Sequence, residues 1–273
     1  MLSDIAGETG FTAWRNPDQL RAGLTSGEIL LSVVPIQAAA NLYNRGFPIR
    51  LANAMTDGLL YIVAEDPDIT TMPDLAGRHI AVPFRGDTPE IIFGQLRDSH
   101  SMSENDFQIT YAGSPKEAMQ MMLAGRVDVA LTAEPPTMAA VLRGRQAGKE
   151  MRRGISVQEA WGQMTGAAPV LPQAGLALTQ AFLEESGDAV PVLLTALEKA
   201  TADVLANPDA AAVHATEPVG IPAALLAASV PNSNLFARPA AEARTDIERM
   251  LAAMAGDDLA RIGGAMPDDA FYL

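Results

Sequence analysis

The 273-residue sequence contains no cysteine, which excludes disulfides, cysteine-bound zinc and a thiol nucleophile. Histidine is scarce as well: His79, His100 and His214 lie far apart, and none stands at metal-ligand spacing from another. Neither a GxSxG nucleophile elbow nor a Walker-type phosphate loop occurs. The sequence therefore lacks the motifs of the common hydrolases, zinc proteins and nucleotide-binding proteins. We expect a protein without catalytic residues, bound metal or cofactor.

The sequence also contains few basic side chains and no long apolar run. The sequence has 19 Lys and Arg residues and 33 Asp and Glu residues, which gives a formal net charge of −14. Because binding to phosphate backbones needs a basic surface, a nucleic-acid partner is not expected. No run approaches the roughly 18 apolar residues of a membrane span. The longest runs, residues 29–35 and 59–64, have the length of buried strands, and the chain is long enough for two lobes of ordinary domain size.

An internal repeat organises the first half of the chain. Residues 11–46 align without gaps to residues 109–144, at a constant offset of 98. Each copy shows a short strand and then a helix that begins with a capping side chain followed by proline, Asn16-Pro17 in the first copy and Ser114-Pro115 in the second. A glycine, an apolar strand and a second helix complete each copy.

Two such units predict an α/β fold with two similar lobes, because a helix that connects parallel strands packs against their sheet. We expect residues 1–66 and 173–273 to form lobe 1 and residues 67–172 to form lobe 2. Strands are predicted at residues 29–34, 79–83, 127–131 and 175–178. From about residue 180 onward the alanine-rich sequence predicts helices. Prolines are expected to break these helices at Pro191, Pro208, Pro218 and Pro222.

Three loops that follow predicted strands lead into helices. In open α/β sheets a ligand binds beyond the carboxyl ends of the strands, where helix starts expose backbone N–H groups that suit an anionic or carbonyl group. Ordinary self-capped helix starts look the same in sequence, so both interpretations stay open. The candidate ligand-binding residues of these loops are Pro35 and Gln37, then Arg85, Gly86, Asp87 and Thr88, and finally Glu134.

Three further residues are candidates for ligand contacts. Asp57, in the turn Thr56-Asp57-Gly58, either faces the ligand or only makes the turn. Trp14 and Trp161 are the two tryptophans of the chain. Aromatic side chains often line small-molecule sites, although an isolated tryptophan is more often part of a core. Either role is compatible with the sequence around each of these residues.

Three segments resemble the nitrate/sulfonate/taurine and thiamine-precursor group of ABC-importer solute-binding proteins. Residues 74–83, DLAGRHIAVP, are similar to that group's DLKGKKIAVP segment. Residues 114–135 are similar to its signature that runs from Ser-Pro through Gly-Arg-Val-Asp to Glu-Pro. Residues 14–20 with Gly27-Glu28 resemble the counterpart in the first lobe. The resemblance covers about residues 11–180.

The resemblance implies a type II periplasmic-binding fold, in which two α/β lobes joined by two crossover strands enclose a ligand cleft. It implies that the protein captures a small polar or anionic organic molecule, such as a sulfonate, nitrate, taurine or a pyrimidine-like compound, by hinge closure. An ABC permease and its ATPase are the implied partners. The implied location is the periplasm, and the chain is expected to be a monomer.

Two departures from this group bear on the ligand. Residues 1–4 show neither the basic nor the apolar region of a signal peptide, and the group's first strand–Gly–helix segment is missing. We therefore expect a trimmed N-terminus and incomplete first-lobe contacts. Where sulfonate binders offer small hydroxyl residues, this sequence has Asp87, which disfavours a bare anion unless Arg85 offsets its charge.

Two other classes of protein share this fold. A cytoplasmic enzyme, such as a thiamine-pyrimidine-precursor or menaquinone-pathway enzyme, would fit the missing signal peptide, but no nucleophile, metal cluster or His–carboxylate pair stands out. The effector domain of a transcription regulator would normally follow an N-terminal helix-turn-helix, which the sequence lacks. Solute binding is therefore the preferred prediction.

Overall fold

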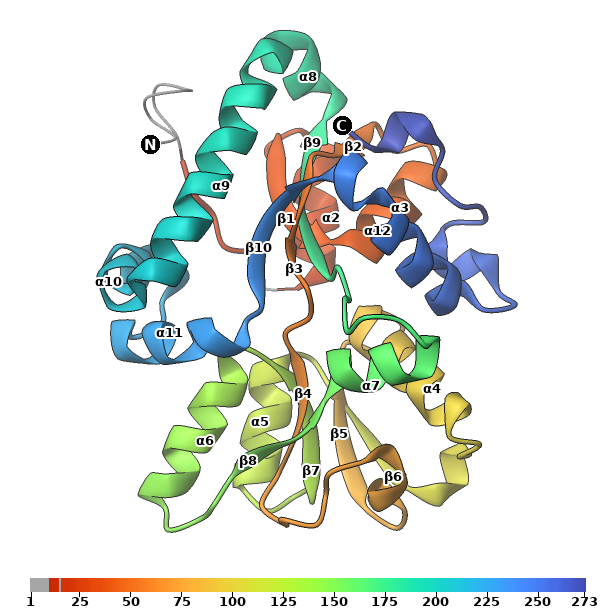
Figure 1. Cartoon of the computed structure of the whole chain (residues 1–273), viewed down its shortest axis with the longest axis vertical. Coiled ribbons are helices and arrows are strands. Elements are labelled where there is room, and N and C mark those ends of the chain that lie inside the picture. Colours follow the sequence, from red (N-terminus) through yellow and green to blue (C-terminus); the bar gives the residue numbers. More distant parts are fainter. Residues whose placement is uncertain (1–9, 15) are drawn as a thin grey trace. The chain divides into compact units, whose positions relative to one another are not determined.

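In the computed structural model, the described residues are 10–14 and 16–273, and they form two compact units (Figure 1). Unit 1 consists of the described residues up to Thr56 with Pro172–Val230 and Asn234–Leu273, and unit 2 of Asp57–Leu171 with Pro231–Ser233. Each unit contains a five-stranded sheet with helices packed around it. The predicted α/β class is therefore confirmed.

The division between the units falls earlier than the sequence predicts. The expected boundary is at residue 66, whereas the first segment of unit 1 ends at Thr56. The difference comes from the strand β4 (Leu60–Ala64), which pairs with strands of the second sheet on both of its sides. All five residues of β4 are buried, so this apolar run forms the middle of unit 2 and does not close unit 1.

Unit 1 is built on a mixed sheet with the strand order β1-β9-β3-β10, in which β2 also pairs with β9. β9 runs antiparallel to β1, β2 and β3, so these three strands are parallel to one another. The strands are β1 (Leu31–Pro35), β2 (Ile49–Leu51), β3 (Asn53–Thr56), β9 (Ala174–Thr179) and β10 (Leu235–Pro239). The helices are α2 (Pro17–Ser26), α3 (Ile36–Asn44), α8 (Gln180–Ser186), α9 (Val190–Ala206), α10 (Pro208–Val219), α11 (Ala223–Ser229) and α12 (Ala240–Ala255), with short 3₁₀ turns η3 (Gly187–Ala189), η5 (Leu259–Ile262) and η6 (Asp269–Phe271). The 3₁₀ turn η4 (Val230–Asn232) begins in unit 1 and ends in unit 2.

Unit 2 has the strand order β6-β5-β7-β4-β8. β5 is parallel to β6 and β7, whereas β4 is antiparallel to both β7 and β8. Strands β5, β6, β7 and β8 therefore end at one edge of the sheet, and β4 begins there. The other strands are β5 (His79–Pro83), β6 (Gln108–Ala112), β7 (Val129–Ala133) and β8 (Arg152–Ser156). The helices are α4 (Thr88–Ser99), α5 (Pro115–Leu123), α6 (Pro136–Gln146) and α7 (Val157–Thr165), with 3₁₀ turns η1 (Met72–Leu75) and η2 (Glu104–Asp106).

The helix starts predicted from the repeat are confirmed. The Asn16 side chain caps α2 by accepting a hydrogen bond from Gln19 N at 2.9 Å. Ser114 caps α5 in the same way, accepting from Glu117 N at 3.1 Å. β1 and β7 keep the offset of 98 residues, and the four strands predicted outright all form within two residues of their expected positions. Local capping and apolar runs were thus sufficient to locate these elements.

Three strands differ from expectation. Residues 10–14 form no strand, and the Trp14 ring N–H instead donates to the Val33 carbonyl of β1 at 3.1 Å. β8 and β10 form although the sequence predicts neither. β8 begins with two arginines followed by Gly154, and all five residues of β10 are only half-buried, so neither shows the apolar alternation of a typical strand.

The alanine-rich part of unit 1 is helical, as predicted, except that Pro218 lies inside α10 and does not end it. The apolar stripe of α12 follows the helical period: Ile247, Met250, Leu251 and Met254 are at most 1% exposed. Within the described ranges no single helix is long and apolar enough to cross a membrane. α10 and the segment Ala223–Asn232 meet that criterion only as a pair bent by 120°.

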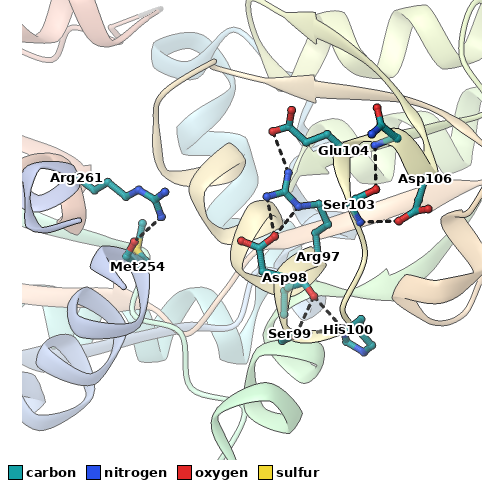
Figure 2. Close-up of polar contacts among 11 residues, drawn as sticks. Arg97, Asp98, Ser99, His100, Ser103, Glu104, Asp106, Met254 and Arg261 are labelled. Atoms are coloured by element: carbon teal, nitrogen blue, oxygen red, sulfur yellow. Dashed lines mark hydrogen bonds and ion pairs between the residues drawn. The ribbon is translucent and has the colours of Figure 1, made fainter. Parts of the chain in front are cut away.

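A polar network holds the end of α4 that lies away from β5 (Figure 2). The Arg97 guanidinium pairs with Asp98 at 2.7 Å and with Glu104 of η2 at 3.1 Å. His100 Nδ1 lies 2.9 Å from the Leu96 carbonyl, so this imidazole belongs to the end of the helix. Across the described part of the chain, no group of three His, Asp or Glu side chains is arranged to hold a metal ion.

Gly175 marks a close approach between β9 and β3 and offers a test of the unit 1 sheet. A β-carbon at Gly175 would lie 2.2 Å from the Asn53 backbone oxygen. We expect Gly175→Ala to force the two strands apart and to lower the free energy of unfolding by at least about 2 kcal/mol, measured by urea denaturation. Gly94→Ala in α4, where a β-carbon meets nothing within 4 Å, is the matched control and should add about 0.5–1 kcal/mol. Equal stabilities of the two variants would contradict this account.

Candidate functional site

The carboxyl edge of the unit 2 sheet gathers five segments of the chain. The loops after β5, β6, β7 and β8 run into α4, α5, α6 and α7, and the turn before β4 lies at the same edge. The connection that leaves β5 runs to β6 on one side, whereas the connection that leaves β7 runs past β4 to β8 on the other side, so the direction of the connections reverses between the neighbouring strands β5 and β7. α4 packs with α7, and α5 packs with α6. In open α/β sheets such a reversal marks the edge position where ligands bind.

Glu134, directly after β7, carries a fully buried carboxylate, with 0% of its side chain exposed. Its Oε1 accepts hydrogen bonds from two nitrogens of the Arg153 guanidinium, Nε at 2.8 Å and Nη2, and its Oε2 accepts one from the Met138 backbone N–H at 3.1 Å. Burial raises the pKa of Glu134 above its ordinary value because water no longer stabilises the charge, and the bonds from Arg153 and Met138 oppose this rise. The Arg153 guanidinium therefore stabilises the buried negative charge of Glu134, and the Glu134 carboxylate is the ion-pair partner of Arg153.

A chain of hydrogen bonds lies beside this ion pair. The Arg153 guanidinium carbon is 5.4 Å from the centre of the Tyr61 ring. The Tyr61 hydroxyl donates to the Asn232 carbonyl at 2.9 Å and accepts from Gln158 Nε2 at 3.2 Å, which assigns the two ends of the Gln158 amide. Gln158 is 8% exposed, and its Oε1 has no hydrogen-bond partner among the described residues. This edge therefore holds a buried acceptor to which no described residue donates.

Gly58, in the turn before β4, leaves room for the Gln158 side chain of α7. Gly58 has a φ of 107°, a conformation that residues with a side chain rarely adopt. A β-carbon there would lie 2.7 Å from Gln158 Cβ and 3.3 Å from Gln158 Oε1. Gln158 is the second residue of α7, whose first turn is capped by Ser156. The unused oxygen therefore lies beside the turn that contains Asp57.

The loop between β5 and α4 has internal partners for its polar groups. Gly86, with a φ of 81°, donates its N–H to the Glu90 carboxylate in the first turn of α4. A hydrogen bond to Glu90 also raises the pKa of the Tyr111 hydroxyl, and burial adds to the rise. The Arg85 guanidinium carbon lies 4.8 Å from the centre of the Tyr111 ring. Arg85, Glu90 and Tyr111 thus form one cluster over the loop.

Unit 1 has a corresponding edge, where β1 and β3 end and β9 begins. The Gln173 N–H donates to the Thr56 carbonyl at 3.2 Å, and the Ile36 N–H donates to the Gln173 carbonyl at 3.0 Å. Gln37, the second residue of α3, is buried, and its side-chain amide donates to the Arg261 carbonyl of η5. This bond joins α3 to the C-terminal segment.

The structure brings six of the ten predicted ligand residues to one edge of unit 2. Asp57 precedes β4, Arg85–Thr88 follow β5, and Glu134 follows β7. Trp161 lies on α7 of the same unit but is only 1% exposed, so its ring is part of the core. The remaining three lie in unit 1: Trp14, Pro35 and Gln37. Contact with a ligand stays a prediction for all ten.

Four residues of the unit 2 edge are not predicted from the sequence: Tyr61, Arg153, Gln158 and Asn232. Arg153 lies in β8, a strand without a sequence signal, and Asn232 comes from a short segment remote from the rest of unit 2 in the chain. One signal does exist for Gln158. Ser156-x-x-Glu159 is the pattern of a capping box, which predicts a helix start and therefore places Gln158 in its first turn.

Replacing Arg153 tests the buried ion pair. Arg153→Met leaves the Glu134 carboxylate buried without its cation, so the free energy of unfolding should fall by about 3–5 kcal/mol at pH 8. Losing the cation raises the pKa of Glu134 further above its unfolded-state value. A group with a raised folded-state pKa loses stability as the pH rises through that pKa, so part of the loss should be recovered at pH 5. Urea denaturation at the two pH values measures the difference.

Two controls accompany this variant. Arg152→Met removes a neighbouring arginine that is 39% exposed and pairs with the exposed Glu150, and it should change the free energy of unfolding by less than about 0.5 kcal/mol. The double variant Glu134→Gln/Arg153→Met has no carboxyl left to titrate at this position and should lose the extra pH dependence. A destabilisation by Arg153→Met that is the same at pH 5 and pH 8 would argue against an unpaired buried carboxylate.

Comparison with protein families identifies one match. A family model described as NMT1/THI5 like matches residues 17–211, a span that includes the strand ends of both units from Pro35 to Gln173. No curated protein matches the chain.

Solved structures share the fold at low sequence identity. An ABC transporter structure from Parabacteroides distasonis has a TM-score of 0.78 and 22% identity, and the match covers 95% of this chain and 86% of that one. The periplasmic aliphatic sulphonate binding protein SsuA from Escherichia coli has a TM-score of 0.71 and 18% identity, over 91% and 79%. The desulfurization enzyme DszB has a TM-score of 0.56 and 14% identity, over 84% and 79%. These likenesses confirm the predicted type II periplasmic-binding fold.

Proposed function

The chain belongs to the NMT1/THI5-like family, and on that premise we propose that it binds a small solute as the capture component of an ABC importer. The observation that carries the proposal is the unit 2 edge, where five segments meet and the buried Gln158 Oε1 has no partner among the described residues. The fold supports it as well, since a periplasmic sulphonate binding protein has the same fold.

In this proposal the solute contacts residues of both units. Asp57, Arg85–Thr88 and Glu134 provide contacts from unit 2, and Trp161 supports α7 from the core. Trp14, Pro35 and Gln37 provide contacts from unit 1. Binding favours the conformation of the protein that makes more contacts with the solute, because a ligand shifts an equilibrium only through contacts that differ between two states.

The proposed partners are an ABC permease and its ATPase. The proposed location is the periplasm, and the chain is proposed to act as a monomer. The likeness to an ABC transporter structure from Parabacteroides distasonis supports the partners, and the likeness to a periplasmic binding protein from Escherichia coli supports the location.

A second candidate function is that of an enzyme on the same fold. The likeness to the desulfurization enzyme DszB is the observation that favours it. Catalysis needs a group that is poised for proton transfer or nucleophilic attack. Glu134 is a titratable group at the edge, but both of its oxygens already accept hydrogen bonds from Arg153 and Met138. Solute binding is therefore preferred.

Thermal unfolding in the presence of candidate compounds tests solute binding. Sulfonates, nitrate, pyrimidines and amines are added singly to the purified protein, and a compound that binds the folded state raises Tm. A ligand at 100 times its Kd adds about 2.7 kcal/mol to the free energy of unfolding. We expect one class of compound to raise Tm, and native mass spectrometry to show one molecule bound per chain.

Two substitutions test the predicted contacts with that compound. Gln37→Ala and Asp87→Ala should each lower its affinity by about tenfold or more, because each removes a polar partner. Gln180→Ala and Asp209→Ala change the same residue types near the starts of α8 and α10 and should bind like the wild type. Unchanged affinity in both test variants would remove Gln37 and Asp87 from the site. Conversion of the compound to a product would favour the enzyme instead.

A further inference from the structure

The charges at the unit 2 edge restrict which solute binds there, and the inference drawn from them rests on the proposed function. We infer that the solute is a neutral or positively charged molecule that offers N–H donors, and not a sulfonate, nitrate or other anion. Three observations carry this inference. An N–H at each helix start already donates to a side chain of the protein, acidic groups outnumber basic groups, and a buried acceptor has no partner among the described residues.

The first observation concerns α4 and α5. Anions bind at helix starts because the first N–H groups point outward and the positive end of the helix dipole lies there. Here carboxylates of the chain take that place. The Gly86 N–H donates to Glu90 before α4, and the Gly113 N–H donates to Glu117 before α5 at 2.8 Å. Gly86 and Gly113 directly precede the N-cap residues Asp87 and Ser114, so an anionic solute at either helix start would lie next to a carboxylate of the same helix.

N–H groups in the first turns of α6 and α7 also donate to side chains of the protein. The Met138 N–H of α6 donates to the Glu134 carboxylate at 3.1 Å. At α7 the Glu159 N–H donates to the Ser156 hydroxyl at 3.3 Å. At each of the four helix starts at this edge, the N–H of a first-turn residue or of the residue before the N-cap therefore donates to a nearby side chain, and three of these four acceptors are carboxylates.

The second observation is that acidic groups outnumber basic groups at this edge, and that Arg85 and Arg153 already have partners in the protein. The five segments and β8 carry the acidic residues Asp57, Asp87, Glu90, Glu117, Glu134 and Glu159, and the basic residues Arg85, Lys116, Arg152 and Arg153. Arg152 begins β8 at the opposite edge of the sheet and pairs with Glu150. Arg153 donates to Glu134, and Arg85 lies over the Tyr111 ring, whose hydroxyl is hydrogen-bonded to Glu90. Like charges brought together at a binding surface oppose association, so this edge disfavours an anion and tolerates a cation.

The third observation is the Gln158 side chain. Its Nε2 is bound to the Tyr61 hydroxyl, which gives its own proton to the Asn232 carbonyl, so turning the amide over would break this chain. The Oε1 atom is buried and has no partner among the described residues. A buried acceptor without a donor is unfavourable, and an N–H of the solute would satisfy it. The oxygens of a sulfonate or of nitrate have no proton to donate.

Probes of matched shape and opposite charge test the inference on the full chain. Isothermal titration calorimetry compares benzamidine with benzenesulfonate, and agmatine and nicotinamide with ethanesulfonate and nitrate. At least one N–H donor should bind about tenfold or more tightly than every anion. If an anion binds most tightly, the inference is wrong while solute binding stands. If no probe of either class binds, both the inference and the proposed function fail this test.

Gln158→Met tests the acceptor itself, since methionine has a similar length and volume but no strong acceptor. The affinity of the N–H donor that binds best should fall by about tenfold or more. Gln163→Met, at an exposed position of α7, is the matched control and should bind like the wild type. Circular dichroism establishes that both variants fold. Unchanged affinity in a folded Gln158→Met protein overturns the role given to this oxygen, and the wild-type probe comparison decides the solute class without any variant.

Discussion

The buried ion pair between Glu134 and Arg153 ties together the parts of unit 2 on which the candidate site depends. It joins the residue after β7 to the second residue of β8, and Glu134 also holds the first turn of α6 through the Met138 N–H. The guanidinium in turn lies over Tyr61 of β4. Because an unpaired buried charge is far more costly than a paired one, each group keeps the other in place, and three strand ends and one helix start are positioned with them.

Much of the fold is predictable because the interactions that specify it are local. Asn16 and Ser114 satisfy N–H groups only three residues away, and the strands they precede are short apolar runs. β8 lacks such a signal. Arg153 is stable in that strand because of Glu134, which lies 19 residues away, and a partner at this separation leaves no periodic pattern in the sequence. β10, at the edge of its sheet, also lacks a sequence signal, because none of its residues is fully buried.

The candidate site also contains residues that the sequence predicts and residues that it does not. Loops that follow strands are recognisable from sequence, and Asp57, Arg85–Thr88 and Glu134 do reach a common edge. The Tyr61 hydroxyl, by contrast, meets Gln158 across 97 residues and Asn232 across 171, and only the completed fold brings these groups together. For Trp161 the sequence is compatible with a core position and with a ligand contact, and the structure shows that its ring is 1% exposed and packs in the core of unit 2.

The bond from the Gly86 N–H to the Glu90 carboxylate also bears on the speed of binding. A loop whose polar groups are satisfied internally keeps its conformation before any solute arrives, so association requires little ordering of the chain at this point. When a site is organised in advance, related ligands associate at similar rates and differ mainly in how fast they leave. At the binding edge proposed for unit 2, selectivity among solutes would therefore rest on their dissociation rates, because a preformed loop lets related solutes associate at similar rates.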